Sequence, residues 1–274
     1  MKKISYLLGA CLLSLSQFSP AYADIRPTVT NVAPALYSAG LFRLESERSY
    51  KLSLQMVMGI LNSHSTIERD RSLALIARLR KDLVKVTEKN EKANKAMTRA
   101  TNALSDQISG LQNISSKNVA EMYDVNENLL NKLNFLSFAL ESSTEDKNSR
   151  IAALALRQAS LAQRMAKIVL LRSLDKTQAK KEGLLVDLNQ SRIEFVNGMG
   201  LLSNEIENDK AHKERLALAQ QQWMFYEKAL RSTSFTAEEL RNISTTSDRI
   251  AQMMVEMVRL EFGMVPDPKV IAGQ

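Results

Sequence analysis

The chain of 274 residues is poor in cysteine, proline, glycine, histidine and aromatic residues. No proline occurs between Pro34 and Pro266, and the glycines are few, whereas Leu, Ala, Met, Glu, Lys, Arg and Gln are plentiful. A sheet protein of this length needs turn residues and runs of β-branched or aromatic residues, which are missing here. The sequence therefore predicts an all-α fold.

The N-terminus has the layout of a secretory signal peptide. Lys2 and Lys3 precede the apolar run ISYLLGACLLSL, and AYA stands directly before Asp24. Removal of residues 1–23 takes away the only cysteine, Cys11, and so excludes a disulfide, a thiol nucleophile and a thiolate metal site. A lipoprotein modified at Cys11 is less favoured, because apolar residues continue after it. We expect an exported protein, periplasmic if the cell has two membranes.

Charge and hydropathy limit the partners. There are 37 basic and 30 acidic residues, a net charge of +7 that falls to +5 when two lysines leave with the signal peptide. Basic residues alternate with acidic ones and have no stacking aromatics between them, so nucleic acid is not an expected partner. No later segment approaches the roughly 20 apolar residues that cross a bilayer. We expect a soluble, not membrane-spanning, protein.

Local signals mark several helix starts. Ser65–Glu68 (STIE) and Thr236–Glu239 (TAEE) both have the capping-box pattern, in which hydroxyl and carboxylate each bond a free backbone N–H. Together with the breaks between them, these signals predict about eight helices. Helices of this length bury their apolar stripes by packing side by side with short loops.

The chain also shows signs of an internal repeat. An offset of 116 sets Arg48 on Arg164 and Lys51 on Lys167, and LQNIS at 111–115 returns as LRNIS at 240–244. We therefore expect an elongated antiparallel helical bundle built from two four-helix repeats. The first unit would span 24–141 and the second 142–264, followed by a tail, 265–274.

Two arginines stand on apolar helix stripes. Arg48 shares a helical face with Leu41, Leu44 and Leu52, and Arg164 shares one with Leu161, Ile168 and Leu171. A buried, unpaired guanidinium costs several kcal/mol, so each must reach water, pair with a carboxylate or meet a bound anion. The simplest partner of Arg48 is Glu45, a surface pair worth under ~1 kcal/mol. If the halves pack through their first helices, the two arginines would face each other. A planar oxyanion such as nitrate, nitrite or a small carboxylate would then accept bonds from both.

These segments resemble a known family. AGLFRLESERSYKL at 39–52 and RQASLAQRMAKI at 157–168 are similar to the signature helix of the PilJ/NarX-type periplasmic sensor domain. The resemblance implies a four-helix bundle per unit and, in the nitrate-sensing members, anion binding between paired first helices by the second arginine of the motif. That arginine corresponds to Arg48 in the first unit and Arg164 in the second, and the first motif arginine corresponds to Arg43.

The second unit departs from the family pattern. Ala159 replaces the first motif arginine and Leu156 replaces the motif glycine, so a site would be asymmetric and close helix approach at Leu156 is in question. Family members are usually the outer part of a membrane receptor. This chain shows neither a membrane span nor an output domain, so we expect it to pass its state to a partner.

Two functions follow as hypotheses. The first is a periplasmic ligand-sensing protein that binds a small oxyanion through Arg48 and Arg164, with Arg43, Lys51 and Lys167 tuning the field, and that acts on a membrane sensor or an envelope or pilus protein. The alternative is a structural or interaction protein of type IV pili or the envelope that binds no small molecule. No cofactor is expected. We find no nucleophile with a base, no paired carboxylates and no Gly-rich phosphate turn, so an enzyme is not expected.

Other candidates favour ordinary structural roles. His64 and His212 are the only histidines and lie far apart, so we expect exposed or capping residues and not a metal site. Trp223, Phe225 and Tyr226 are more typical of core packing than of a docking patch.

Overall fold

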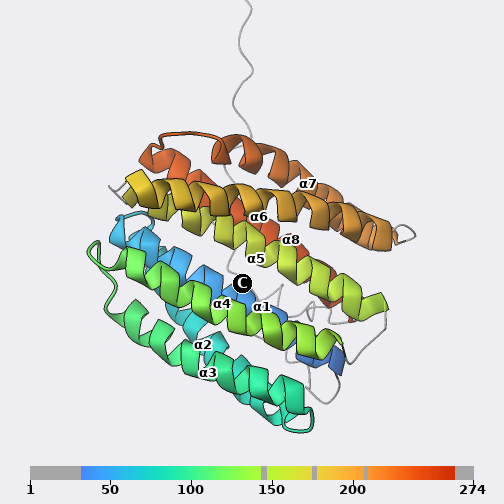
Figure 1. Ribbon diagram of the computed structural model, residues 1–274. Helices are drawn as coiled ribbons and strands as arrows, with labels where there is room; N and C mark the ends of the chain where they lie inside the picture. Colours follow the sequence, from blue (N-terminus) through green and yellow to red (C-terminus); the bar gives the residue numbers. More distant parts are fainter. Residues whose placement is uncertain (1–31, 143–146, 175–177, 207–208, 263–274) are drawn as a thin grey trace, which may run out of the picture.

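The computed structural model describes residues 32–142, 147–174, 178–206 and 209–262, and this part of the chain contains eight α-helices and no β-strand (Figure 1). The helices are α1 (Val32–Val57), α2 (Asn62–Thr87), α3 (Glu91–Gln112), α4 (Val119–Glu141), α5 (Lys147–Leu174), α6 (Gln178–Glu205), α7 (Lys210–Leu230) and α8 (Ala237–Glu261). The predicted all-α class is confirmed. The expected signal peptide and the tail lie outside the described residues.

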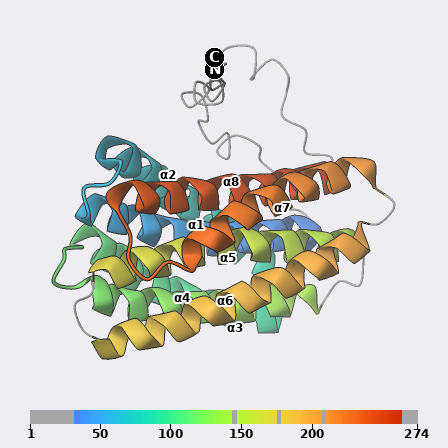
Figure 2. The same cartoon turned by 90° about the horizontal axis from the view of Figure 1, so that it is seen from above.

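The helices pack in two groups of four that meet at their first members. In one group α1 packs against α2 and α4, and α3 packs against α4; in the other, α5 packs against α6 and α8, and α7 packs against α8. Helices α1 and α5 run side by side where the groups meet (Figures 1 and 2). The expected contact between the first helices of the two halves is confirmed, whereas their origin by duplication stays a prediction.

This central position explains the unusual burial pattern of α1 and α5. Each contacts helices on several sides and so has little solvent-facing surface, and polar residues that a peripheral helix would expose are buried. Those of α1 are Ser38, Glu45, Ser46, Glu47, Arg48, Ser49, Lys51, Ser53 and Gln55, and those of α5 are Ser149, Gln158, Ser160, Gln163 and Lys167. Buried charges are tolerated only when they are paired and hydrogen-bonded, so partners must come from the surrounding helices.

A glycine allows the two central helices to approach closely. A Cβ added at Gly40 of α1 would lie 2.5 Å from Cδ1 and 2.8 Å from Cβ of Leu156 on α5. The sequence put close approach of the two motif helices at Leu156 in question, but α1 and α5 do approach closely where Gly40 contacts Leu156. The approach is asymmetric, because a glycine from one helix receives a leucine from the other.

One expected helix cap is confirmed and the other is wrong. At the start of α8 the Glu239 backbone N–H donates to Thr236 Oγ1 at 3.2 Å, and the Thr236 N–H donates to Glu239 Oε2 at 2.7 Å. In contrast, α2 begins before Ser65, after Leu61 in a left-handed conformation with φ 51°. Ser65 lies inside the helix, where its hydroxyl donates to Gln55 Oε1 at 3.0 Å. Ser65 and Glu68, which the local pattern assigned to a helix cap, make tertiary contacts with Gln55 and Arg48 of α1.

The repeated pentapeptide does not mark equivalent places. LQNIS at 111–115 covers the end of α3 and the loop after it, whereas LRNIS at 240–244 lies inside α8. The offset of 129 between them is therefore wrong as a structural correspondence. Similar helical composition accounts for the match.

Candidate functional site

The Arg48 side chain is buried and surrounded by carboxylates. Its Nη2 lies 2.7 Å from Glu68 Oε2 on α2, its Nη1 lies 3.6 Å from Glu45 Oε2, and its Nε lies 3.5 Å from Asp248 Oδ1 on α8. Nη1 also donates to Ser72 Oγ at 3.3 Å. Burial alone would lower the pKa of Arg48, but Glu45, Asp248 and Glu68 raise the pKa above its ordinary value. The guanidinium is therefore charged and compensated from within the protein.

Lys51 lies one turn further along α1 and is also paired. Its Nζ donates to Asp248 Oδ1 at 2.8 Å, to Ser247 Oγ at 3.2 Å and to the Ser244 carbonyl at 3.3 Å, all on α8. Asp248 additionally accepts a bond from Gln163 of α5 at 3.0 Å. Burial would raise the pKa of Asp248, but Lys51 and Arg48 together hold the pKa below its ordinary value.

Arg164 forms the corresponding cluster on the other side of the central pair. Its Nη1 donates to both carboxylate oxygens of Glu127 on α4, at 2.8 and 2.6 Å, and its Nε donates to Ser191 Oγ on α6 at 3.2 Å. Glu47 of α1 lies 3.8 Å away. Burial would lower the pKa of Arg164, but Glu47 and Glu127 raise the pKa above its ordinary value.

Lys167 completes this second cluster. Its Nζ lies 2.5 Å from Glu47 Oε2 and 2.9 Å from Glu127 Oε1, and it donates to Asn126 Oδ1 at 2.6 Å. The same Nζ lies 5.8 Å from the ring centroid of Tyr50 and 5.1 Å from that of Tyr123, within cation–π range. Lys167 is fully buried, so it depends wholly on these neighbours.

The two lysines make crosswise contacts. Lys51 belongs to α1 in the first group of helices and binds Asp248 of α8 in the second group. Lys167 belongs to α5 in the second group and binds Glu127 of α4 in the first. Glu127 and Asp248 therefore occupy corresponding places, each holding the arginine and the lysine of a motif helix. The four predicted cations Arg48, Lys51, Arg164 and Lys167 form the junction between the groups.

The assumption behind the predicted anion clamp is wrong. We expected Arg48 and Arg164 to repel each other until an external anion separated them, but each has its own carboxylates, Glu68 and Glu127, at 2.7 and 2.6 Å. Arg48 lies closer to Glu68 of α2, at 2.7 Å, than to Glu45 of its own helix, at 3.6 Å. Because the two cations are already compensated, neither needs a ligand to remain buried.

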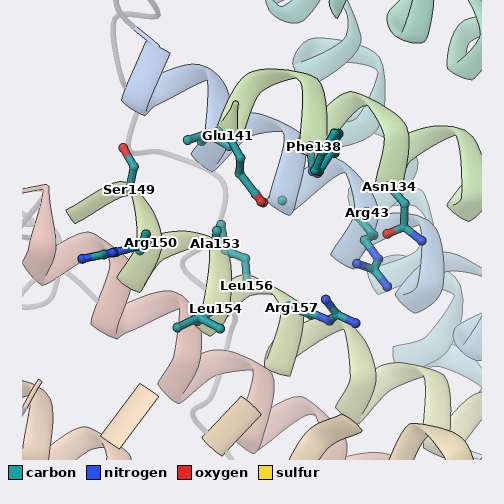
Figure 3. Close-up of a pocket in the computed structure, with 13 residues that line it drawn as sticks. Arg43, Asn134, Phe138, Glu141, Ser149, Arg150, Ala153, Leu154, Leu156 and Arg157 are labelled. Carbon is teal, nitrogen blue, oxygen red and sulfur yellow. The ribbon is translucent and has the colours of Figure 1, made fainter. Parts of the chain in front are cut away.

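The remaining predicted residue, Arg43, lines a pocket between α1, α4 and α5 (Figure 3). The cavity has a volume of about 450 Å³. Its lining residues are Leu36, Gly40 and Arg43 of α1, Asn134, Ser137, Phe138 and Glu141 of α4, and Ser149, Arg150, Ala153, Leu154, Leu156 and Arg157 of α5. The close contact of Gly40 with Leu156 thus belongs to the pocket wall.

Arg43 differs from the other motif cations in its contacts. Its Nε is buried without a hydrogen-bond partner, and the guanidinium makes no hydrogen bond or ion pair with any residue in the described part of the chain. Burial lowers the pKa of Arg43, Arg157 and Arg164 lower it further, and Glu47 and Glu194 act in the opposite direction. An arginine keeps its charge at neutral pH, so the pocket contains a cation without a paired carboxylate.

Two further arginines line the pocket, and each already has a carboxylate partner. Arg157 pairs with Glu194 of α6 at 2.9 Å, and Arg150 pairs loosely with Glu205 at 3.7 Å. Figure 3 shows Arg43 and Arg157 together at the end of the pocket near Asn134, and Arg150 at the opposite end. Glu141 is the single acidic residue of the lining. Burial raises the pKa of Glu141, although Arg157 and Arg43 oppose the shift.

Of the residues that line this pocket, the sequence pattern predicted only Arg43 as a ligand-binding residue. Arg157 is part of the motif helix 157–168, but the offset of 116 sets Arg43 on Ala159 and gives Arg157 no counterpart. Asn134 and Phe138 carry no motif at all. Both are exposed on α4 in the structure, Phe138 at 70%, and no sequence pattern marked either of them.

The minor candidates have mixed outcomes. His64 is exposed as expected, whereas His212 is buried, with Nδ1 2.9 Å from Asp209 Oδ2 and Nε2 3.0 Å from Glu261 Oε2. Tyr226 is buried and Trp223 stacks on Phe195 with ring centroids 4.4 Å apart, so core packing is confirmed for these two. Phe225, 73% exposed, does not take part in the core.

Comparison with known proteins gives no match, whether with family models, curated proteins or solved structures. The resemblance to the PilJ/NarX-type domain therefore stays a prediction. Among the helices of the described residues, none combines the length and the hydropathy that a bilayer span requires.

Proposed function

We propose that this protein is an exported, non-enzymatic binding protein for a small oxyanion, and that the anion binds in the pocket between α1, α4 and α5. The observation that carries the proposal is Arg43, a guanidinium in a pocket wall with no partner among the described residues. The anion class is the one expected from the motif helices. The position is new, because the charges of Arg48 and Arg164 are already compensated.

Electrostatics of the pocket supports this assignment. Arg43 and Arg157 come from the two central helices; burial is the largest cause of the lowered pKa of Arg43, and the nearby charge of Arg157 lowers that pKa further. An oxyanion between them would relieve that repulsion and accept charge-assisted hydrogen bonds from planar donors. Arg157 is already paired with Glu194 at 2.9 Å, so Arg43 is the member of this pair for which an anion would supply the counter-charge.

The position of the pocket also supports transmission to a partner. Arg43 belongs to α1 and Arg157 to α5, the two helices through which the groups of four meet. An anion that draws these side chains together would favour one arrangement of α1 relative to α5 over others. A partner that reads the relative position of the two groups would then respond to the ligand.

Thermal unfolding with nitrate, nitrite, acetate and sulfate tests the proposal. At a free concentration about 100 times the dissociation constant, a bound anion stabilises the protein by ~2.7 kcal/mol, equivalent to roughly 5–10 °C for a chain of this size. Arg43→Gln should abolish the shift. The matched control is Arg99→Gln, which removes an exposed arginine of α3 far from the pocket lining and should leave the shift intact.

The unfolding temperature of Arg43→Gln in the absence of any anion gives a second readout. Arg43 has no ion pair to lose, so Arg43→Gln should unfold at the same temperature as the wild type or higher, which separates loss of binding from loss of fold. A shift that survives Arg43→Gln would place the anion elsewhere. Absence of any shift across the panel would reject the proposal.

One observation favours the alternative, an interaction protein of the envelope. Several large apolar side chains are exposed: Phe135 and Phe138 on α4, Leu185, Val186, Ile193, Val196 and Leu201 on α6, and Met224 and Phe225 on α7. Exposed apolar patches are typical of contact sites, and α6 carries more of these side chains than any other helix of the described residues. A photo-reactive residue at position 193 should then cross-link to one envelope protein in producing cells, whereas the same residue at position 99 should not.

A further inference from the structure

We propose that the ligand of the α1/α4/α5 pocket is an organic carboxylate with an apolar body, and not an inorganic oxyanion. This inference rests on the proposed function and names the chemical class of its ligand. Three features of the pocket support it: its size, the apolar part of its wall, and the location of its unpaired cation at one end.

The size argues against a ligand of only a few atoms. A volume of about 450 Å³ falls within the range of roughly 300–1,000 Å³ that is usual for sites of small organic molecules. A water molecule in liquid water takes up ~30 Å³. Nitrate or nitrite would therefore leave most of the space to solvent, and little of the binding free energy could come from exclusion of water.

The wall between the two ends combines the Glu141 side chain of α4 with apolar side chains (Figure 3). Leu36, Leu154 and Leu156 contribute side chains from α1 and α5, and Phe138 contributes a ring from α4 that is 70% exposed. A ligand body lying against this ring would cover apolar surface that otherwise contacts water. Each covered Å² contributes ~25 cal/mol, so the body is a main source of affinity.

Two of the three arginines that line the pocket lie together at one end, which would orient such a ligand. Figure 3 shows Arg43, Arg157 and Asn134 grouped at one end of the pocket. Arginine donors and an amide match the planar carboxylate, which accepts two parallel hydrogen bonds from one guanidinium. The acid group would bind there and the apolar body would extend past Phe138 toward Leu154.

Direct titration with four probes tests this inference. Phenylacetate should bind at least ~10-fold more tightly than acetate or nitrate, because the ring adds apolar contact. Phenylacetamide has the same shape without the charge and should bind ~10-fold or more weakly than phenylacetate, since hydrogen bonds to a charged group are lost. Arg43→Gln should reduce phenylacetate binding to the level of the amide.

A pair of phenylalanine variants separates the apolar contribution. Phe138→Ser should weaken phenylacetate several-fold and leave acetate unchanged. Phe135→Ser is the matched control, because Phe135 is 63% exposed on the same helix but does not line the pocket. Both side chains are exposed, so neither change should unfold the protein.

The outcomes distinguish this inference from the proposed function. If nitrate and acetate bind as tightly as phenylacetate and Arg43→Gln abolishes all three, the inference is wrong and the oxyanion site stands. If the amide binds as tightly as the acid, both are wrong, because the pocket then selects shape and not charge. If none of the four probes binds, both are again rejected.

Discussion

Replacement of Lys167 by methionine is the most direct test of the buried charge clusters. Methionine keeps the length of the side chain but removes the ammonium, which lies 2.5 Å from Glu47 and 2.9 Å from Glu127. Of the ion pairs that Glu47 forms within the described residues, the one with Arg164 at 3.8 Å would remain, although the Glu47 side chain is 1% exposed. Breaking one partner of a buried ion pair costs about 3–5 kcal/mol, because a charge is left without compensation.

Urea unfolding of four variants at pH 7 measures this cost. Lys167→Met should lose about 3–5 kcal/mol at an unchanged m-value, and Glu47→Leu should lose a similar amount. The double variant removes both charges and should be more stable than the sum of the single losses predicts, with a coupling of roughly 0.5–3 kcal/mol. Lys95→Met is the control, since Lys95 pairs with Glu91 on the surface, where the side chains are 68% and 80% exposed. That pair should contribute under ~0.5 kcal/mol.

Two results would refute the reasoning. Equal losses in Lys167→Met and Lys95→Met would mean that the cluster is solvated and that burial gives it no special energy. Strict additivity of the single losses in the double variant would mean that Lys167 and Glu47 do not compensate each other.

Three further predictions concern packing, pH and capping. Gly40→Ala should destabilise the protein by about 1–3 kcal/mol despite the better helix propensity of alanine, because the new methyl group would lie 2.5 Å from Leu156. A free energy of unfolding that stays the same or rises would contradict the close contact. Asp248 has a folded pKa below its unfolded value of ~3.9, so its stabilising contribution is present above pH 4 and is lost as pH falls through the folded pKa. The cost of Asp248→Asn should therefore be larger at pH 7 than at pH 2.5, and equal costs would show that the carboxylate is not responsible. Thr236→Ala should cost about 1 kcal/mol in thermal unfolding through loss of the helix cap, with Thr245→Ala, in the interior of the same helix, as the comparison.

The fold class could be predicted because it depends on local composition. No proline interrupts a helix between Pro34 and Pro266, so composition alone indicates the helical class. The start of α8 depends on two residues that are only three positions apart. Ser65 and Glu68 show the limit of such reasoning. Their spacing fits a cap equally well, but contacts with Gln55 and Arg48 decide their roles.

The charge partners could not be predicted, because they are distant in sequence. Glu68 is 20 residues from Arg48, Glu127 is 37 residues from Arg164, and Asp248 is 197 residues from Lys51. The pattern showed that a buried guanidinium needs a counter-charge but not which element supplies it. A bound anion and a carboxylate from another helix satisfy that need equally well, and only the packing distinguishes them.

The crosswise lysines have a consequence for how the chain reaches its native state. Lys51 has its ion-pair partner on α8 and Lys167 has one on α4, so each group of four helices carries an ammonium whose hydrogen-bonded carboxylate lies in the other group. A half made by itself would present a bare ammonium and a bare carboxylate on a face otherwise suited to association. We therefore expect each half to be less stable alone than within the whole chain, and a half exchanged for another would have to supply the same ions at the same places.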